Sequence, residues 1–181
     1  MPLDVTSDAS VAAAADTVAA GGGLDVLINN AGITGPHREP AELTGADALA
    51  VYDTNVAGVV RVTHAFVPLL RGSDAPTIVN VTSGLGSFAV ASDPERIESK
   101  IIAPLYTSSK SAVTMLTVQY AKALPEMRIN AVDPGYTATD LNANSGTQTV
   151  QEGTDAIVDL ATRGGTGPTG TFIDRSGVAP F

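Results

Sequence analysis

The chain has 181 residues, a formal net charge of −9 at pH 7 and no cysteine. This length suits one domain with its own core, and the charge argues against nucleic acid or anionic membranes as partners, because phosphate contacts need clustered lysine and arginine. The missing cysteine excludes disulfides, thiol catalysis and cysteine-bound metals.

The first 70 residues predict two helical stretches and one clear strand. A short apolar run at 2–6 precedes an alanine-rich, helix-prone segment at 11–20. Three glycines end that segment, and an apolar strand at 24–30 follows. A loop at 33–40 then leads to a stretch at 43–70 that we interpret as mainly helical.

The rest of the chain continues the alternation. Apolar runs and turn residues predict strands at 77–82, 128–132 and 171–174 and helices at 106–124 and 150–162. The connection at 84–105 has no clear hydrophobic period. The polar stretch at 136–147 is rich in glycine and asparagine, and we expect it to be a mobile loop.

Strands that alternate with helices indicate βαβ units and a parallel sheet, so we predict a single α/β domain, Rossmann-like and doubly wound, over residues 1–181. In such sheets ligands bind at the carboxyl ends of the strands. Three polar motifs follow predicted strands, namely Asn29-Asn30-Ala31-Gly32, Ser83 and Asp133-Pro134-Gly135. Each motif alone fits ordinary turn chemistry, but their shared edge predicts a ligand site.

Three side chains at this edge suggest proton transfer coupled to redox chemistry at a C–O bond. Tyr106 and Lys110 are four positions apart on a predicted helix, so they share one face. An ammonium near a phenol lowers the pKa of the phenol from about 10. Such a tyrosine can exchange a proton with a carbonyl or alcohol oxygen, which the Ser83 hydroxyl could also bind. Taken alone, the Tyr–Lys pair also fits a solvated surface pair.

The order and spacing of these motifs resemble the short-chain dehydrogenase/reductase family. The matching segments are Asn29-Asn30-Ala31-Gly32, Asp53-Thr54-Asn55-Val56, Val79-Asn80-Val81-Thr82-Ser83, Tyr106 to Lys110, and Asn130-Ala131-Val132-Asp133-Pro134-Gly135. Ser83 and Tyr106 lie 23 positions apart, longer than is usual in the family. The extra segment, roughly 86–104, is similar to the carbonyl-reductase-like branch.

The resemblance implies hydride transfer between a nicotinamide cofactor and a carbonyl or alcohol. Tyr106 would be the general acid in reduction, and Lys110 would bind the nicotinamide ribose and keep Tyr106 acidic. Ser83 would orient the substrate oxygen, and Asn55 would bind a water in a proton relay. The implied cofactor contacts are Tyr106 and Lys110, Asn30, Ala31 and Gly32 on the adenosine side, Pro134, Gly135 and Thr139 beside the nicotinamide and pyrophosphate, and Asp4 and Val5 at the adenine.

Structural roles remain open for several of these residues. Asn30 also fits a strand-stabilising amide, and Asn55 fits an amide that bends its helix. Thr139 also fits a simple loop hydroxyl. Asp4 fits a structural role better than an adenine contact.

The family's first two βα units have no counterpart here. The chain starts at the position of the family's third strand, so we interpret it as N-terminally truncated. It lacks the glycine-rich turn that takes the pyrophosphate, and the three glycines at 21–23 precede a strand instead of following one. The residue that selects between NAD and NADP is also absent, although we expect NADP(H) in preference to NAD(H).

This gap leads to three structural expectations. The strand at 24–30 becomes an edge of the sheet, which invites pairing with another chain. Residues 1–20 are displaced or pair directly with that strand. Free dinucleotide binds weakly or not at all.

Two functions follow. The first is an NADPH-dependent carbonyl reductase, or most of one, whose true start lies upstream of Met1. The second is a catalytically inactive truncated form that acts as a binding or assembly module.

The substrate would be a small carbonyl or alcohol bound by residues 86–104 and 140–150, and the assembly a monomer or homodimer. We expect no nucleic acid, membrane or metal, with His37 in a loop and His64 on a helix surface. The chain shows no signal peptide and no apolar run of the ~18 residues that a membrane helix needs, so we expect a cytoplasmic protein.

Overall fold

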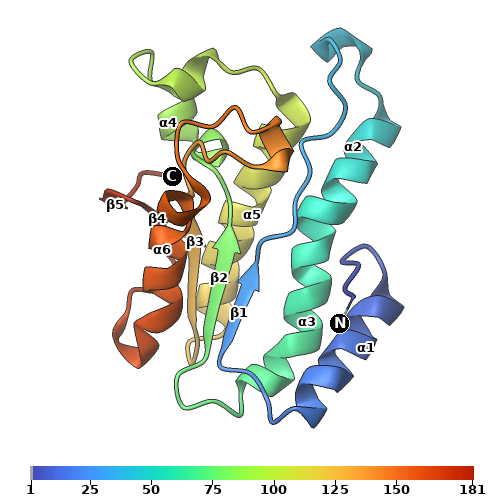
Figure 1. The fold of residues 1–181 in the computed structure, drawn as a ribbon, viewed down its shortest axis with the longest axis vertical. Helices are drawn as coiled ribbons and strands as arrows, with labels where there is room; N and C mark the ends of the chain where they lie inside the picture. Colours follow the sequence, from blue (N-terminus) through green and yellow to red (C-terminus); the bar gives the residue numbers. More distant parts are fainter. Residues whose placement is uncertain (1) are drawn as a thin grey trace.

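The computed structural model describes residues 2–181 and contains one five-stranded sheet (Figure 1). The strand order is the chain order, with β1 (Val26–Asn29), β2 (Thr77–Val81), β3 (Arg128–Val132), β4 (Phe172–Asp174) and β5 (Gly177–Val178). The first four strands are parallel, and β5 is antiparallel to β4. The predicted Rossmann-like parallel sheet is therefore confirmed, with a short antiparallel strand added.

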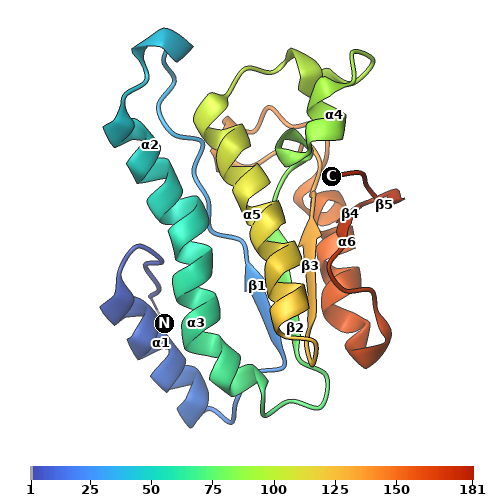
Figure 2. The same ribbon diagram turned by 180° about the vertical axis from the view of Figure 1, so that it is seen from behind.

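Helices cover both faces of this sheet. The main helices are α1 (Asp8–Ala20), α2 (Gly45–Tyr52), α3 (Gly58–Leu70), α4 (Phe88–Ser92), α5 (Pro104–Ala123) and α6 (Val150–Thr162). α5 and the continuous pair of helices α2 and α3 lie on one face of the sheet, and α6 lies on the other (Figures 1 and 2). Serine or threonine side chains begin four of them, because Ser7, Thr44, Ser87 and Thr149 each accept a hydrogen bond from a first-turn amide.

Apolar side chains fill both sides of the sheet. β2 is buried along its whole length, as expected for a central strand covered on both faces. One cluster joins α1, α3 and α5 to the sheet and includes Val11, Phe66 and Ile129. A second cluster lies under α6 and includes Val79 and Ile157. Ser83 and the turn after β3 therefore leave the sheet from a rigid base.

The predicted edge strand is confirmed, but the predicted fate of the N-terminal segment is wrong. Among the described residues β1 pairs only with β2, and Ile28 is 43 % exposed. Residues 2–6 form no strand, so they do not extend the sheet. α1 is not displaced either, because Val11 and Ala14 are buried in the cluster with α3. Apolar packing on α3 holds this helix in place without a neighbouring strand.

The long connection after β2 contains short helices that the sequence pattern did not predict. They are η3 (Gly84–Gly86), α4 and η4 (Ile97–Lys100). The end of the chain fastens this segment, since Ser87 Oγ donates to Pro180 O at 2.8 Å and the Ala89 N–H donates to Phe181 O at 3.1 Å. The 136–147 stretch folds on itself through a bridge between Thr137 and Gln148 and a short 3-10 turn, η5 (Asp140–Asn142). Its mobility stays a prediction.

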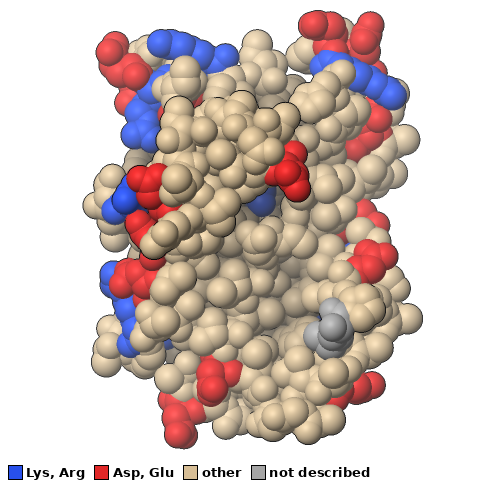
Figure 3. Space-filling model, in the orientation of Figure 1, with Lys and Arg blue, Asp and Glu red and all other residues tan. Residues whose placement is uncertain are grey.

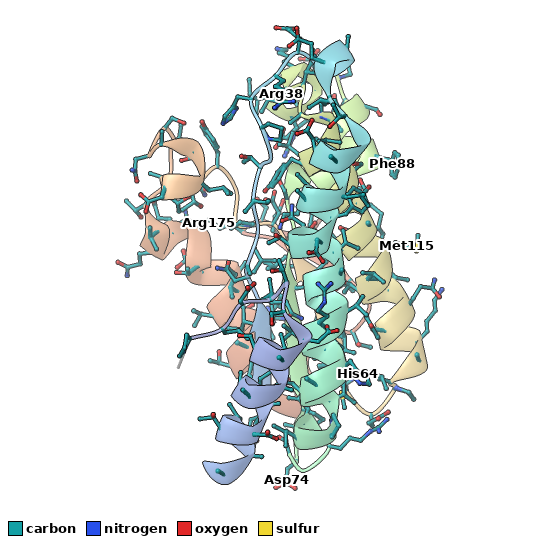
Figure 4. All side chains as sticks on the ribbon, turned by 90° about the vertical axis from the view of Figure 1, so that its right-hand side faces the viewer. Arg38, His64, Asp74, Phe88, Met115 and Arg175 are labelled. Carbon is teal, nitrogen blue, oxygen red and sulfur yellow. The ribbon has the colours of Figure 1, made fainter. Side chains whose placement is uncertain are left out.

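The surface agrees with the acidic composition. Acidic side chains are dispersed over the face seen in Figure 3, and basic ones mostly lie beside them. Arg61, for example, pairs with Asp8 and Asp53. Phe88, Met115 and His64 point outward in Figure 4, and His64 lies on the exposed surface of α3 as expected. Among residues 2–181 no helix has the length and apolar character needed to cross a bilayer.

Candidate active site

The predicted motifs meet at the carboxyl edge of β1, β2 and β3. These strands point the same way, and α5 begins at that edge (Figures 1 and 2). Ser83 is the second residue after β2, and Tyr106 lies in the first turn of α5. The Thr82 hydroxyl, beside Ser83, donates to Lys110 O at 2.9 Å. This bond ties the serine strand to the tyrosine helix.

Lys110 is buried under this edge, with 4 % of its surface exposed. Its Nζ donates to Val81 O at 2.9 Å and lies 5.7 Å from the centroid of the Tyr106 ring. Tyr106 and Lys110 therefore share one face of α5, as predicted. Burial lowers the pKa of Lys110 to about 8, because the charged ammonium is desolvated.

The expected lowering of the Tyr106 pKa is wrong for this cofactor-free chain. Burial raises the pKa of the phenol, a hydrogen bond with the Ser83 side chain opposes that rise, and the charge of Asp133 adds to it. Desolvation penalises the phenolate more than the neighbouring groups favour it. The Tyr106 hydroxyl is thus protonated at neutral pH.

Asn55 connects three segments of the site. It lies in a π-helix, η2 (Asp53–Ala57), between α2 and α3. Its Nδ2 donates to Ile33 O and to Ser109 Oγ, both at 2.9 Å, and its Oδ1 accepts from the Ile33 N–H at 2.8 Å. Such π-turns are frequent at functional sites. Both N–H donors of the Asn55 amide are used in joining the loop after β1 to α5. The helix-bending role and a place in the site both fit this arrangement.

Gly32 lets the loop after β1 lie against Lys110 and Asn55. A Cβ at this position would lie 3.4 Å from Lys110 Nζ and 3.5 Å from Asn55 Oδ1. Asn30 and Ala31, just before it, are exposed at the edge of the sheet. The missing side chain at Gly32 thus allows the loop backbone to lie directly against Lys110 and Asn55.

A buried amide pair, which was not assigned a role from the sequence, supports this edge. Asn29 Nδ2 donates to Asn80 Oδ1 at 2.8 Å, and Asn80 Nδ2 donates to Thr117 Oγ1 at 2.9 Å. The chain of bonds joins β1, β2 and α5. The available signal was an asparagine inside each of two apolar strands, since buried amides need partners.

Pro134 and Gly135 form the turn after β3 at the same edge. Gly135 has φ +70°, and its N–H donates to Asp133 Oδ1 at 2.9 Å. Thr139 lies further along and caps the short turn η5, since the Asn142 side chain accepts from its N–H. A loop-capping role for Thr139 is thus visible, whereas its cofactor contact stays a prediction.

Asp4 and Val5 belong to the N-terminal segment, which lies beside α3. Val5 lines a groove next to the edge of β1 that has no neighbouring strand within residues 2–181. Asp4 Oδ1 accepts from the Thr6 N–H at 2.9 Å and from the Thr6 hydroxyl at 2.7 Å, so the carboxylate already closes a local turn. Val5 packs against Gly58, where a Cβ would approach to 2.9 Å. A groove of about 150 Å³ runs here between the N-terminal segment, β1 and α3; its lining includes Leu3, Val5, Ile28, Asn30, Ala31 and Val59.

Comparison with known proteins agrees with this geometry. The family model described as short chain dehydrogenase matches residues 1–150. A short-chain dehydrogenase of Penicillium roqueforti, anuI, is 40 % identical over 169 residues, which cover 90 % of this chain and 67 % of the relative. Short-chain dehydrogenase/reductase 1 of Saponaria officinalis is 34 % identical, with 99 % of this chain and 77 % of the relative covered.

Solved structures give the same result. An NADPH-bound carbonyl reductase from chicken fatty liver superposes with a TM-score of 0.82 at 28 % identity, over 99 % of this chain and 76 % of that one. Salutaridine reductase from Papaver somniferum superposes with a TM-score of 0.79 at 26 % identity, over 94 % and 80 % of the two chains. On sequence, fold and motif placement, this chain belongs to the short-chain dehydrogenase/reductase family of oxidoreductases.

Proposed function

We propose that the chain carries the proton-transfer half of an NADPH-dependent reductase that converts a small carbonyl compound to an alcohol. The observation that carries this proposal is the meeting of a phenol, an ammonium, a hydroxyl and an amide at one edge of the sheet, from Tyr106, Lys110, Ser83 and Asn55. Four chemically complementary groups from three segments of the chain are hard to explain by packing alone.

The residues present fit the nicotinamide end of such a cofactor better than its pyrophosphate. Lys110 Nζ uses one donor on Val81 O, which leaves two for ribose hydroxyls. Gly32 lets the loop after β1 lie against Lys110, and the Gln148 side chain packs against Gly135 on the other side. The pyrophosphate usually binds at a glycine-rich turn between a strand and a helix, and residues 2–181 show no such turn. Asn30, Ala31 and Pro134 would contact the cofactor from the loops that carry them.

When bound, the reduced nicotinamide supplies the hydride. The chain's own residues supply the proton and hold the substrate. Tyr106, protonated at neutral pH, donates to the substrate oxygen as negative charge develops there. Lys110 lies close enough to stabilise the phenolate that remains, and at pH 7 most of it is charged because its pKa is about 8. Ser83 orients the same oxygen through its hydroxyl.

Two relatives favour NADP(H) over NAD(H). The chicken carbonyl reductase was solved with NADPH, and another structural neighbour, ElxO, with NADP. ElxO superposes with a TM-score of 0.79 at 26 % identity. The preference can be tested directly by comparing NADPH and NADH at equal concentration.

The decisive experiment follows NADPH oxidation by the purified chain with a panel of aldehydes and ketones. Tyr106→Phe should lower any measured rate about 10²- to 10⁴-fold, the range for a general acid. Tyr136→Phe, on an exposed loop, is the matched control and should keep the rate. A rate that survives Tyr106→Phe would refute the assigned role, and no oxidation with any carbonyl would refute the activity of this chain.

A second candidate, an assembly module without catalysis, is favoured by one observation. β1 is an edge strand with an apolar side chain exposed on it, and such edges pair with other chains. A folded, cofactor-free oligomer without reductase activity would support this function. A monomer at all concentrations would exclude assembly through β1.

A further inference from the structure

A single carboxylate lies between the two loops that form the walls of the proposed site. Asp133 directly follows β3, and its backbone N–H donates to Ile173 O at 2.8 Å, so β4 fixes its position. β2 and β3 are adjacent parallel strands (Figure 1). The turns that follow them therefore leave the sheet side by side, with Asp133 at the base of one.

Each oxygen of Asp133 faces a different loop. Oδ1 accepts the Gly135 N–H at 2.9 Å. Oδ2 faces Gly84, where a Cβ would come within 2.8 Å of it. Gly84 is buried and adjoins Ser83, whereas Gly135 adjoins Pro134. One side chain thus contacts both walls.

Several charged groups face this carboxylate from other elements. Glu98, in η4, would lie 3.3 Å from a Cβ on Gly84, and it pairs with Arg96 at 3.0 Å. Asp174 approaches from β4, and the Tyr106 phenol lies near enough to sense the charge. Burial raises the pKa of Asp133, the Gly135 and Gly84 amides lower it, and Asp174 and Glu98 raise it further, so the net direction is upward.

We propose that Asp133 is a positioning residue whose carboxylate joins the turn after Ser83 to the Pro134–Gly135 turn, so that the two walls keep a fixed spacing. Its value for catalysis rests on the proposed function. The contact between Asp133 and the two turns needs no bound cofactor. Without it, the Ser83 hydroxyl loses a fixed distance to the opposite wall, although Tyr106 stays on α5.

The first test follows the ¹⁵N chemical shifts of the Gly84 and Gly135 amides with pH. If both amides donate to one carboxylate, both shifts change with a common midpoint above 3.8, the ordinary aspartate value. Asp133→Asn, which keeps the shape, should abolish both transitions. Asp174→Asn is the control, and it should keep both while moving the midpoint down. Two unrelated midpoints, or transitions that persist in Asp133→Asn, would overturn the proposal.

The second test measures amide hydrogen exchange. Asp133→Ala should raise exchange at Gly84 and Gly135 together by about tenfold, the effect of losing a charge-assisted hydrogen bond, while Ile129 in β3 keeps its protection. Asp133→Asn should raise it less, because its Oδ1 still accepts. Unchanged exchange at either glycine in Asp133→Ala would count against the tie.

A third variant covers the case in which Asp133→Ala does not fold. Gly84→Ala places a Cβ within 2.8 Å of Oδ2, so it should shift the Gly135 amide resonance, whereas Gly45→Ala, whose Cβ would meet nothing within 4 Å, should leave it unchanged. An equal shift in both variants, or none in either, would reject the tie. Because none of these measurements needs NADPH, a chain that reduces no carbonyl would refute the proposed function and leave this inference to be judged separately.

Discussion

The two edges of β1 differ in their neighbours: the inner edge pairs with β2, and the outer edge has no strand beside it among the described residues. On the inner side, a series of buried hydrogen bonds joins β1 to β2 and α5 through Asn29, Asn80 and Thr117. On the outer side, among the described residues, β1 has no neighbouring strand, and Ile28 is 43 % exposed. The contrast separates the groups that we propose to transfer a proton from the region where we expect a dinucleotide to lie.

The groups proposed to transfer a proton are held mainly by β2 and α5. Lys110 and the residue before Ser83 bond across these two elements, and Asn55 joins the π-helix to α5 and to the loop after β1. Asp4 and Val5 are held by a local turn and by α3. We therefore expect a preorganised proton-transfer site beside a weak dinucleotide site.

The largest stability effect should come from breaking the inner side at Asn55. Asn55→Ala removes three hydrogen bonds from a side chain that is 1 % exposed and leaves the buried Ser109 hydroxyl without this donor. We expect a loss of about 3 kcal/mol in the free energy of unfolding, measured by urea denaturation. Asn30→Ala, an exposed amide on the same loop, is the control and should cost less than about 0.5 kcal/mol. Equal losses would mean that Asn55 is not a structural centre of the site.

The next effect tests the burial of Lys110 through pH. Its pKa falls from 10.5 to about 8 on folding, so between these values the unfolded chain binds more protons than the folded one. Stability from this group therefore rises with pH across that window, by about 2 kcal/mol from pH 8 to 10. Lys110→Met should remove this rise, and Lys122→Met, on the exposed end of α5, should keep it. A rise of the same size in Lys110→Met would contradict the buried ammonium.

Much of the inner side could be predicted from the sequence because it is encoded locally. Buried strands are apolar runs ended by turn residues, and the positions of Ser83, Tyr106 and Lys110 follow from those runs and one helical period. The direction of the Tyr106 pKa could not be predicted, since it depends on burial, which no local pattern reports. β5 is too short, at two residues, to leave a pattern.

The outer side was harder to predict for a related reason. The sequence correctly gave an edge strand, but the position of α1 depends on contacts with α3 about fifty residues away. Val11 and Ala14 carry no sign of that partner in an alanine-rich helix. The Asp133 carboxylate was likewise visible only as part of a turn, and its contact with Gly84 required the two strands to be adjacent.

A smaller effect tests whether α1 packs on α3 in solution. Val11 is 2 % exposed, so Val11→Ala should cost about 1.5 kcal/mol in the free energy of unfolding through lost apolar burial. Asp16→Ala, on the exposed face of the same helix, should change it by less than about 0.5 kcal/mol. If both variants behave alike, α1 is displaced from the core after all.

The smallest stability effect should come from the outer edge itself. Ile28→Lys places a charge on a side chain that is already 43 % exposed, so we expect a change of about 0.5 kcal/mol or less in chemical denaturation. Charges on an edge strand also oppose pairing with another chain, so any self-association through β1, followed by sedimentation velocity at several concentrations, should weaken. Val60→Lys, 38 % exposed on α3, is the matched control and should leave association unchanged. A loss as large as that of Asn55→Ala would show that the outer face of β1 is covered in solution, and the contrast between the two sides would then not hold.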